Sequence, residues 1–437
     1  MVSLGCSKNQ VDAERLLYSL QEAGFALSGN TGDCDVVIIN TCAFIEDAKK
    51  ESIDTIFEFA AQKGKGRLKG LVVTGCMPER YREEFVKELP EVDVALGIGK
   101  NADIVAAVQS LLEGKGGSAF GEKEALSLEG GRVLANAPWF AYLKIAEGCD
   151  NRCSYCAIPD IRGCFRSRPM EKVLEEAREL VAGGVRELNV VAQDTSRYGE
   201  DLYGKLMLPQ LLTQLCGIEG LHWVRVLYCY PDRVTDELLD VMAGQPKIVP
   251  YMDLPLQHAS GRILKAMYRK GDHKSLLALC RHIREKVPGI ILRTTFITGF
   301  PGETQEDFET LCEFIRDVRF ERLGCFAYSR EEDTPAHDLP DQIDEDQKAR
   351  RAEIVMGMQA EIACSLAMEM VGRQIEVLCE GWDQGEQRWW GRGPGDASDI
   401  DTRVYFTGSA RPGEFVQVKI TGAEGYDLIG EETASAN

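Results

Sequence analysis

Six short runs rich in β-branched and aromatic residues alternate with helical stretches through the middle of the sequence. The runs start at residues 140, 187, 223, 251, 291 and 322, and helices are expected between them, for example over 170–182, 206–216, 235–242 and 305–317. A helix between two strands returns the chain to the starting edge of the sheet, so the strands should run parallel. Six such units predict a partial (β/α)6 barrel. With a long charged helix at about 344–369, this barrel should fill residues 139–370.

The regions on either side predict two further domains. Residues 1–113 alternate strand-like runs, for example at 34–40 and 70–75, with amphipathic helices at 11–23, 46–61 and 101–112, which predicts a doubly wound parallel sheet. The glycine-rich and charged stretch 114–138 should be a linker. Short alternating runs between 371 and 437 predict a small β-barrel. We therefore expect an α/β chain with three domains.

Three cysteines follow the first strand of the predicted barrel. Cys149, Cys153 and Cys156 have the spacing C-x3-C-x2-C in "GCDNRCSYC". Thiolates are the usual ligands of iron–sulfur clusters, and a 4Fe-4S cluster has four irons. Three ligands on one loop would leave the fourth iron open for a small molecule, as catalytic zinc sites keep one position open. The alternative is a structural zinc site, for which Cys164 is the nearest fourth ligand.

Three other cysteines occupy equivalent places near the N-terminus. Cys6, Cys42 and Cys76 each follow one of the first three predicted strands, in "SLGC", "IINTC" and "VVTGC". The carboxyl ends of parallel strands meet at one edge of a sheet, where α/β proteins bind their ligands. A single free cysteine is often only a small buried hydrophobic residue. Three at the same topological position predict a second 4Fe-4S cluster with an open iron.

Composition indicates the surroundings in which this chemistry works. No apolar run reaches the roughly 18 residues that a membrane span needs, and the start of the sequence shows no signal peptide, so we expect a cytoplasmic protein with no membrane contact. Fifteen cysteines in a reducing compartment indicate metal ligands more than disulfides. The net charge of −20 would repel nucleic-acid phosphates and attract a basic protein.

The sequence resembles the radical S-adenosylmethionine methylthiotransferases. The resemblance is carried by "LGCSKNQVDAE", "NTCAF", "TGCMPERY" and "EGCDNRCSYCAIPDIRGCFRSRP", in this order, and it covers nearly the whole chain. It implies an N-terminal cluster domain, a radical S-adenosylmethionine barrel and a C-terminal TRAM domain. S-adenosylmethionine would then serve both as methyl donor and as the source of a 5′-deoxyadenosyl radical, with sulfur delivered at the N-terminal cluster.

The resemblance also implies how the cofactor and electrons are handled. Tyr155, beside the last cysteine of the barrel loop, would lie against the adenine of S-adenosylmethionine. Gln193, Gln257 and Thr298, which lie at the ends of predicted strands, are the other candidates for cofactor contacts. Clusters and cofactor carry the chemistry, so no catalytic side chain is assigned. A reducing electron donor such as flavodoxin would be required.

Two features favour a protein substrate over tRNA. The stretches "SLGCSKNQVDAE", "PLQHAS" and "GDASDIDTRVYF" resemble the branch that modifies an aspartate β-carbon of small-subunit ribosomal protein S-twelve (RimO type) more than the tRNA branches. Residues 371–437 contain six Lys and Arg against twelve Asp and Glu, a balance of −6. We expect Asp396, Asp399 and Asp401 to help dock this basic protein. The alternatives are tRNA adenosine methylthiolation, an iron–sulfur scaffold or electron carrier, and a structural zinc protein.

Overall fold

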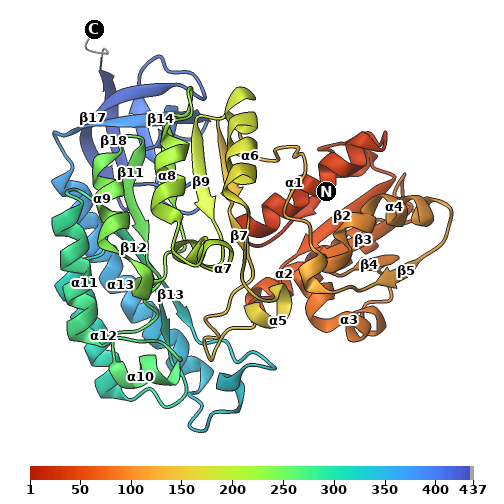
Figure 1. The fold of residues 1–437 in the computed structure, drawn as a ribbon, viewed down its shortest axis with the longest axis horizontal. Helices are drawn as coiled ribbons and strands as arrows, with labels where there is room; N and C mark the ends of the chain where they lie inside the picture. Colours follow the sequence, from red (N-terminus) through yellow and green to blue (C-terminus); the bar gives the residue numbers. More distant parts are fainter. Residues whose placement is uncertain (434–437) are drawn as a thin grey trace.

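The N-terminal domain is a five-stranded parallel sheet in which neighbours in sequence are neighbours in space. The computed structural model describes residues 1–433, so 434–437 at the end of the predicted small β-barrel lie outside it. The sheet order is β1-β2-β3-β4-β5, and Figure 1 shows the domain in red to orange. Its elements are β1 (Val2–Ser3), α1 (Ser7–Glu22), β2 (Val36–Thr41), α2 (Glu46–Ala60), β3 (Gly70–Gly75), α3 (Cys76–Glu88), β4 (Val94–Leu96), α4 (Ile104–Leu112) and β5 (Gly117–Ala119).

Helices cover both faces of this sheet because successive side chains of a strand point to opposite faces. Ile38 of β2 packs with Leu16 of α1 and Val108 of α4 in one core. The next residue, Ile39, packs on the other face with Ile56 of α2 and with residues of α3. The layered parallel sheet predicted from the alternation of strands and helices is confirmed.

The stretch 114–138, predicted as a linker, is partly structured. Its residues 117–119 form β5 and pair in parallel with β4. Farther along, Arg132 forms buried ion pairs with Glu14 of α1, at 2.5 Å, and with Glu176, at 2.7 Å. Its glycine and charge content indicated a flexible tether, but these charged groups pair with residues of both neighbouring domains. The segment therefore ties the two domains together.

The middle of the chain forms the predicted six-stranded barrel. All six strands are parallel, in the order β6-β9-β10-β11-β12-β13. The strands are β6 (Phe140–Lys144), β9 (Glu187–Val191), β10 (Trp223–Val226), β11 (Ile248–Asp253), β12 (Ile291–Thr298) and β13 (Arg322–Ala327). The main helices are α6 (Met170–Ala182), α8 (Leu208–Cys216), α9 (Asp236–Gly244), α11 (His273–Lys286), α12 (Gln305–Val318) and α13 (Glu345–Glu369). Short elements complete the loops: β7 (Ala146–Glu147), α5 (Ile158–Arg162), β8 (Arg166–Ser167), α7 (Glu200–Tyr203) and α10 (Gly261–Ala266).

The C-terminal domain is a closed barrel with the strand order β14-β15-β16-β18-β17. Its strands are β14 (Gln374–Asp383), β15 (Arg388–Arg392), β16 (Val404–Thr407), β17 (Phe415–Glu424) and β18 (Asp427–Thr433). The strand β15, not expected from sequence, contains Trp389, which packs against the core of this barrel. This tryptophan therefore contributes to the hydrophobic core of the domain.

The two outer domains lie against different parts of the central barrel (Figure 1). The C-terminal domain contacts the amino ends of the barrel strands, where its Arg392 pairs with Glu187, the first residue of β9. The N-terminal domain contacts the carboxyl ends, where Lys144, the last residue of β6, pairs with Asp12 of α1. Within the described residues, none of the helices combines the length and apolarity needed to cross a membrane.

Candidate functional site

The cysteine loop of the central barrel is folded tightly by its own backbone. Gly148 has φ +78°, and a Cβ atom there would lie 2.1 Å from a backbone carbonyl oxygen, so the position requires glycine. The Cys149 N–H donates to the carbonyl of Gly163 at 3.1 Å. The Cys156 N–H donates to the carbonyl of Cys153 at 3.0 Å. These bonds hold the loop that carries the three thiols.

The thiols of this loop lie close enough for the charge of one to shift the pKa of another. Burial raises the pKa of Cys149 to about 11, and the Cys153 thiol adds to the shift. Burial also raises the pKa of Cys156, again with a contribution from Cys153. Arg269 Nη1 lies 3.8 Å from Cys153 Sγ. Iron binds thiolates and so would release the protons that burial retains, and the nearby guanidinium would offset part of the added negative charge.

The three N-terminal cysteines come together as the strand positions predict. Cys42 directly follows β2, and Cys76 directly follows β3 and begins α3. Cys6 lies between β1 and α1, directly before the helix. Two glycines permit the close approach. Gly5 has φ +90°, and a Cβ atom there would lie 3.1 Å from Cys42 Sγ. Gly75 has φ +98°, and a Cβ atom there would lie 2.5 Å from a backbone oxygen of β2.

These three thiols also share one electrostatic environment. Burial raises the pKa of Cys42 to about 12, and the thiols of Cys76 and Cys6 add to the shift. Burial raises the pKa of Cys76 as well, against the effect of Arg162, whose Nη2 donates to Cys76 Sγ at 3.3 Å. Cys6 is exposed by its accessible surface, yet desolvation by the surrounding protein alone would raise its pKa; Lys8 and Arg162 outweigh this and lower it. Arg162 therefore acts on all three thiols, and Cys6 and Cys76 also act on Cys42.

Both sets consist of thiols, which are the usual ligands of iron–sulfur clusters. In the part of the chain that the structure describes, no three His, Cys, Asp or Glu side chains lie close enough to hold one metal ion. In a cluster each thiolate binds a different iron, so the sulfurs stand farther apart than the ligands of one ion. Cys164, the nearest candidate for a fourth zinc ligand, is exposed, and so is Cys6 of the N-terminal set. The donor atoms of both sets are compatible with iron–sulfur ligation.

A buried charge network connects the two sets of cysteines. Arg162, at the end of the helix that follows the barrel cysteines, donates to Cys76 and pairs with Asp12 at 2.6 Å. Lys144 contacts Asp12 and pairs with Glu147, which precedes the cysteine loop, at 2.7 Å. Sequence reasoning did not single out these charges, although Asp12 and Arg162 stand inside the motif stretches "CSKNQVDAE" and "CAIPDIRGC". Removing one member of such a buried pair typically costs about 3–5 kcal/mol.

Two of the predicted cofactor contacts line one cavity at the carboxyl end of the barrel. Tyr155 and Gln257 lie in the wall of this 190 Å³ cavity. Gln257 has φ +72°, and its buried Oε1 has no hydrogen-bond partner among the described residues. Sequence reasoning missed the other walls, which are largely apolar: Phe44, Ile45, Thr295, Ile297 and Phe326. An apolar cavity with one free amide oxygen suits a heteroaromatic ring with an N–H group.

The other two predicted contacts differ from each other. Gln193 Nε2 donates to Glu147 Oε1, which places it beside the cysteine loop. The Thr298 hydroxyl instead donates to the carbonyl of Lys348 in α13 at 3.4 Å. Because strand side chains alternate, Ile297 faces the cavity and Thr298 faces the helical layer. The expectation that Thr298 contacts the cofactor is therefore not supported, since its side chain lies on the other face of β12.

The acidic segment of the C-terminal domain is engaged inside the molecule. Asp396, which is 3% exposed, pairs with Arg322 of β13 at 2.6 Å. Asp401 accepts from the Tyr251 hydroxyl at 2.6 Å, and Asp399 accepts from the hydroxyl of a tyrosine in β6. The expectation that Asp396 and Asp401 dock a basic partner is wrong, because both carboxylates are held by residues of the central barrel. Asp399 is exposed, and its part in docking stays a prediction. The crowding of these carboxylates in sequence is relieved by tertiary contacts.

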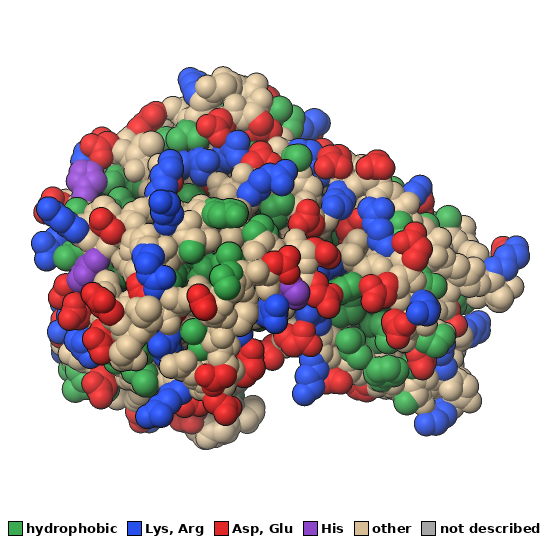
Figure 2. Space-filling model, turned by 90° about the horizontal axis from the view of Figure 1, so that it is seen from below, with side chains coloured by type: hydrophobic (Ala, Val, Ile, Leu, Met, Phe, Trp, Pro, Cys, Tyr) green, Lys and Arg blue, Asp and Glu red, His purple; other side chains and the backbone are tan. Residues whose placement is uncertain are grey.

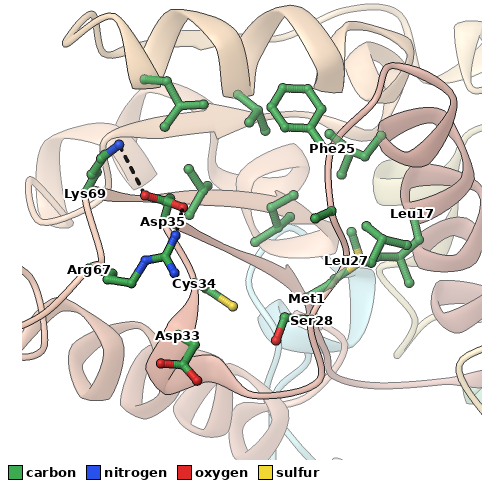
Figure 3. Close-up of a pocket in the computed structure, with 16 residues that line it drawn as sticks. Met1, Leu17, Phe25, Leu27, Ser28, Asp33, Cys34, Asp35, Arg67 and Lys69 are labelled. Atoms are coloured by element: carbon green, nitrogen blue, oxygen red, sulfur yellow. Dashed lines mark hydrogen bonds and ion pairs between the residues drawn. The ribbon is translucent and has the colours of Figure 1, made fainter.

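A second cavity, of about 430 Å³, lies in the N-terminal domain (Figure 3). It is lined by residues of α1, α4 and the start of β2, including Leu17, Phe25 and Cys34. Two carboxylates, Asp33 and Asp35, line it, and Asp35 pairs with Arg67 at 2.9 Å and with Lys69 at 3.2 Å. The cavity adjoins the amino end of β2, whereas Cys42 follows the carboxyl end. It is thus separate from the cysteine site.

Comparison with protein families agrees with the three domains. Residues 1–97 match the uncharacterized protein family UPF0004, residues 143–315 match the radical SAM superfamily, and residues 371–432 match the TRAM domain. The predicted fold class is confirmed.

Two solved structures share this fold at low sequence identity. The radical S-adenosylmethionine methyltransferase TsrM from Kitasatospora setae superposes with a TM-score of 0.54 over 74% of this chain and 72% of that one, at 15% identity. The cobalamin-dependent radical enzyme OxsB superposes with a TM-score of 0.50 over 83% of this chain and 55% of that one, also at 15% identity. These likenesses bear on the fold alone.

Full-length relatives identify the family. The chain is 47% identical over 432 residues, covering 98% of each protein, to the ribosomal protein uS12 methylthiotransferase RimO of Lachnoclostridium phytofermentans. It is 48% identical over 437 residues to that of Desulforamulus reducens, covering 99% of this chain and 98% of the relative. The predicted enzyme class and branch are confirmed. At this identity over nearly the full length, the chain belongs to the family of ribosomal protein uS12 methylthiotransferases, which are radical S-adenosylmethionine enzymes.

Proposed function

We propose that this chain methylthiolates an aspartate β-carbon of ribosomal protein uS12. S-adenosylmethionine serves as methyl donor and as radical source, and sulfur is delivered at the N-terminal cluster. One 4Fe-4S cluster is held by Cys149, Cys153 and Cys156, and a second by the N-terminal set, Cys6, Cys42 and Cys76. The observation that carries the proposal is Arg162, which follows the first set on the chain and donates to Cys76 of the second at 3.3 Å. Two cysteine sets joined in this way can act on one substrate.

The chain's own residues bind and orient the cofactor and shield the reaction from water. When bound, the clusters and S-adenosylmethionine supply the reducing electron, the hydrogen-abstracting radical and the methylated sulfur. Tyr155 and Gln257 line the cavity in which the cofactor's adenine would bind. Phe44 and Ile45 of the N-terminal domain close the same cavity from the other side. Excluding water in this way protects a reactive radical from side reactions.

The N-terminal domain is also anchored at the far edge of the barrel. Glu331, which follows β13, is 2% exposed. It accepts from Arg80 of α3 at 2.7 Å and from Lys49 of α2 at 3.1 Å. These pairs, together with the network around Arg162 near β6, attach the domain at both edges of the barrel opening. The N-terminal cysteines are thereby held over the barrel opening.

Surface charge favours a basic protein partner over tRNA. On the face drawn in Figure 2, acidic and basic side chains are intermixed, and no continuous basic track crosses the described residues shown there. tRNA binding requires cations that neutralise several phosphates. The net charge of −20 favours a basic ribosomal protein. A low-potential protein such as flavodoxin supplies the electrons, and the reaction takes place in the cytoplasm.

Direct competition tests the substrate. Anaerobically reconstituted enzyme receives S-adenosylmethionine, a reductant, uS12 and isopentenyl-adenosine tRNA in one reaction, and mass spectrometry follows both products. We expect a mass increase of one methylthio group on uS12 and none on the tRNA. Modification of the tRNA alone would overturn the choice of substrate and leave the enzyme class intact.

A further inference from the structure

Most buried cations of this protein are paired with a carboxylate. Ten Lys and Arg residues are buried in the described residues, and eight of them form an ion pair: Arg15, Lys144, Arg162, Arg168, Arg225, Lys348, Arg351 and Arg392. Among the same residues, Lys8 and Arg269 have no carboxylate partner. Both lie at the carboxyl end of the barrel, each beside one set of cysteines. An unpaired buried charge is costly, so these two positions point to ligands from outside the chain.

Arg269 finds other acceptors within the protein. Its Nη2 donates to the carbonyl of Pro255 at 2.6 Å, and its Nη1 approaches Cys153 Sγ at 3.8 Å. Its guanidinium also lies over the ring of Tyr230, 4.2 Å from the centroid. The hydrogen-bonding capacity of this side chain is therefore largely used by the barrel and the cysteine loop.

Lys8 differs because its ammonium contacts the Tyr228 side chain and has no carboxylate or carbonyl acceptor among the described residues. The residue is 6% exposed, and its Nζ lies 3.2 Å from the centroid of the Tyr228 ring. No hydrogen bond to a carboxylate or a carbonyl holds this ammonium among the described residues. The charge of Asp253 acts on Lys8 from a distance but forms no ion pair with it, and its oxygens accept from Arg293 at 2.9 Å and from the Tyr228 N–H at 3.0 Å.

The position of Lys8 is that of a group facing the substrate. It lies two residues after Cys6, in the first turn of α1. Val11, one turn later, packs with Leu227 inside the barrel, so the start of α1 covers the barrel opening. Tyr228 follows the end of β10, in the loops where barrel enzymes place their chemistry. The ammonium thus stands between the sulfur-delivering cysteines and the barrel interior.

We propose that the Lys8 ammonium binds the side-chain carboxylate of the aspartate that is modified and so determines specificity for an acidic residue. This inference rests on the proposed function. The ammonium can donate up to three hydrogen bonds, and a carboxylate would supply both the missing charge and the missing acceptors. An amide or a nucleobase in the same place would leave the buried charge uncompensated. A site built in this way rejects an analogue that lacks the matching group.

The test compares two forms of uS12 on the reconstituted full-length enzyme. One form carries the target aspartate and the other carries asparagine at that position, and anaerobic fluorescence anisotropy gives the Kd of each. The variants are Lys8→Met and Lys8→Arg, with Lys87→Met as the matched control, because the Lys87 side chain is 82% exposed in the same domain. The iron content and electron paramagnetic resonance spectrum of the N-terminal cluster are recorded for Lys8→Met after Cys149, Cys153 and Cys156 are replaced by alanine.

We expect the wild type and Lys87→Met to bind the aspartate form at least about tenfold more tightly than the asparagine form. Lys8→Met should reduce this ratio to about one by weakening only the aspartate form, and Lys8→Arg should keep part of it. The N-terminal cluster should be unchanged. A wild-type ratio in Lys8→Met, or loss of the N-terminal cluster's iron or spectrum, would overturn the inference and assign Lys8 to the cluster. Wild-type enzyme that leaves uS12 unmodified would refute the proposed function itself, and this inference with it.

Discussion

The two ends of the central barrel differ in whether every buried cation has a carboxylate partner, although both ends contain buried ion pairs. At the amino end, Glu187 accepts from Arg225 at 2.9 Å and from Arg392 at 2.6 Å, and neither Glu187 nor Arg225 is exposed. At the carboxyl end, Lys8 and Arg269 are buried without a carboxylate. The amino end is closed by the C-terminal domain and its charges balance within the chain. The carboxyl end carries the six cysteines, and two of its buried cations have no carboxylate partner within the described residues. These unpaired cations therefore lie at the end of the barrel where the reaction is proposed to take place.

The largest loss of activity is expected from substitutions at the carboxyl end of the barrel. Replacing Cys149, Cys153 and Cys156 with alanine should abolish reductive cleavage of S-adenosylmethionine, because the cofactor's cluster loses all protein ligands. Chromatographic measurement of 5′-deoxyadenosine under reduction gives the rate, and iron analysis should show that the N-terminal cluster remains. Continued 5′-deoxyadenosine formation by the triple variant would show that these cysteines are not the ligands.

The other set of cysteines should separate cleavage from product formation. With Cys6, Cys42 and Cys76 replaced by alanine, S-adenosylmethionine cleavage should persist, because the barrel loop is closed by its own backbone hydrogen bonds. Methylthiolated uS12 should be absent, because sulfur delivery requires the second cluster. Mass spectrometry of uS12 beside the 5′-deoxyadenosine assay reports both quantities. Normal product formation by this variant would show that the three cysteines serve only in packing.

At the amino end a substitution should affect stability and not chemistry. Glu187→Ala leaves Arg225 and Arg392 without their shared carboxylate, so the free energy of unfolding should fall by about 3–5 kcal/mol. The matched control, Glu424→Ala, removes an exposed carboxylate of the C-terminal domain and should change stability by less than about 0.5 kcal/mol. Denaturant titration measures both. Equal stability of the two variants would contradict the idea that the amino end depends on paired charge.

Lowering the pH should also reduce the free energy of unfolding through Glu187, but by less than the substitution Glu187→Ala does. Burial by itself would raise the pKa of Glu187, but Arg392 and Arg225 outweigh it and hold the pKa below the ordinary value of 4.5. The stabilisation from its ionised form is therefore complete above pH 4.5 and is lost as the pH falls through the lowered pKa. Protonated Glu187 still accepts hydrogen bonds, so the loss should be smaller than in Glu187→Ala. Denaturant titrations between pH 7 and pH 3 should give a flatter profile for Glu187→Gln than for the wild type.

The smallest effect is expected on the outer surface of the C-terminal domain. Charge reversal at Glu424 and Glu431, which are exposed, should change the association rate with uS12 by less than about twofold at physiological salt, because exposed charges interact weakly and are screened. Stopped-flow fluorescence measures the rate. A large, salt-dependent decrease in the association rate would show that this domain is the docking surface, as its net charge of −6 suggested.

Features that depend on local spacing were predictable. The alternation of strands and helices identified both parallel sheets, because a connecting helix forces parallel strands whatever the surrounding packing. The spacing C-x3-C-x2-C identified one set of thiols, and the position after three successive strands identified the other. The resemblance of the motif stretches to the uS12 branch agrees with the relatives. Each of these signals is carried by residues close in sequence or by a topological rule.

Pairing between distant residues was decided only by the tertiary structure. Thr298 and Ile297 are adjacent in sequence, but the register of β12 sends one to the helices and the other to the cavity. Asp396 and Arg322 lie 74 positions apart, so the sequence does not reveal that this carboxylate is paired inside the molecule. Lys8 is one lysine among many in the sequence, and only the fold shows it buried without a carboxylate. A charge acts according to its dielectric surroundings and nearest partner, and both are set by packing between segments that the sequence leaves far apart.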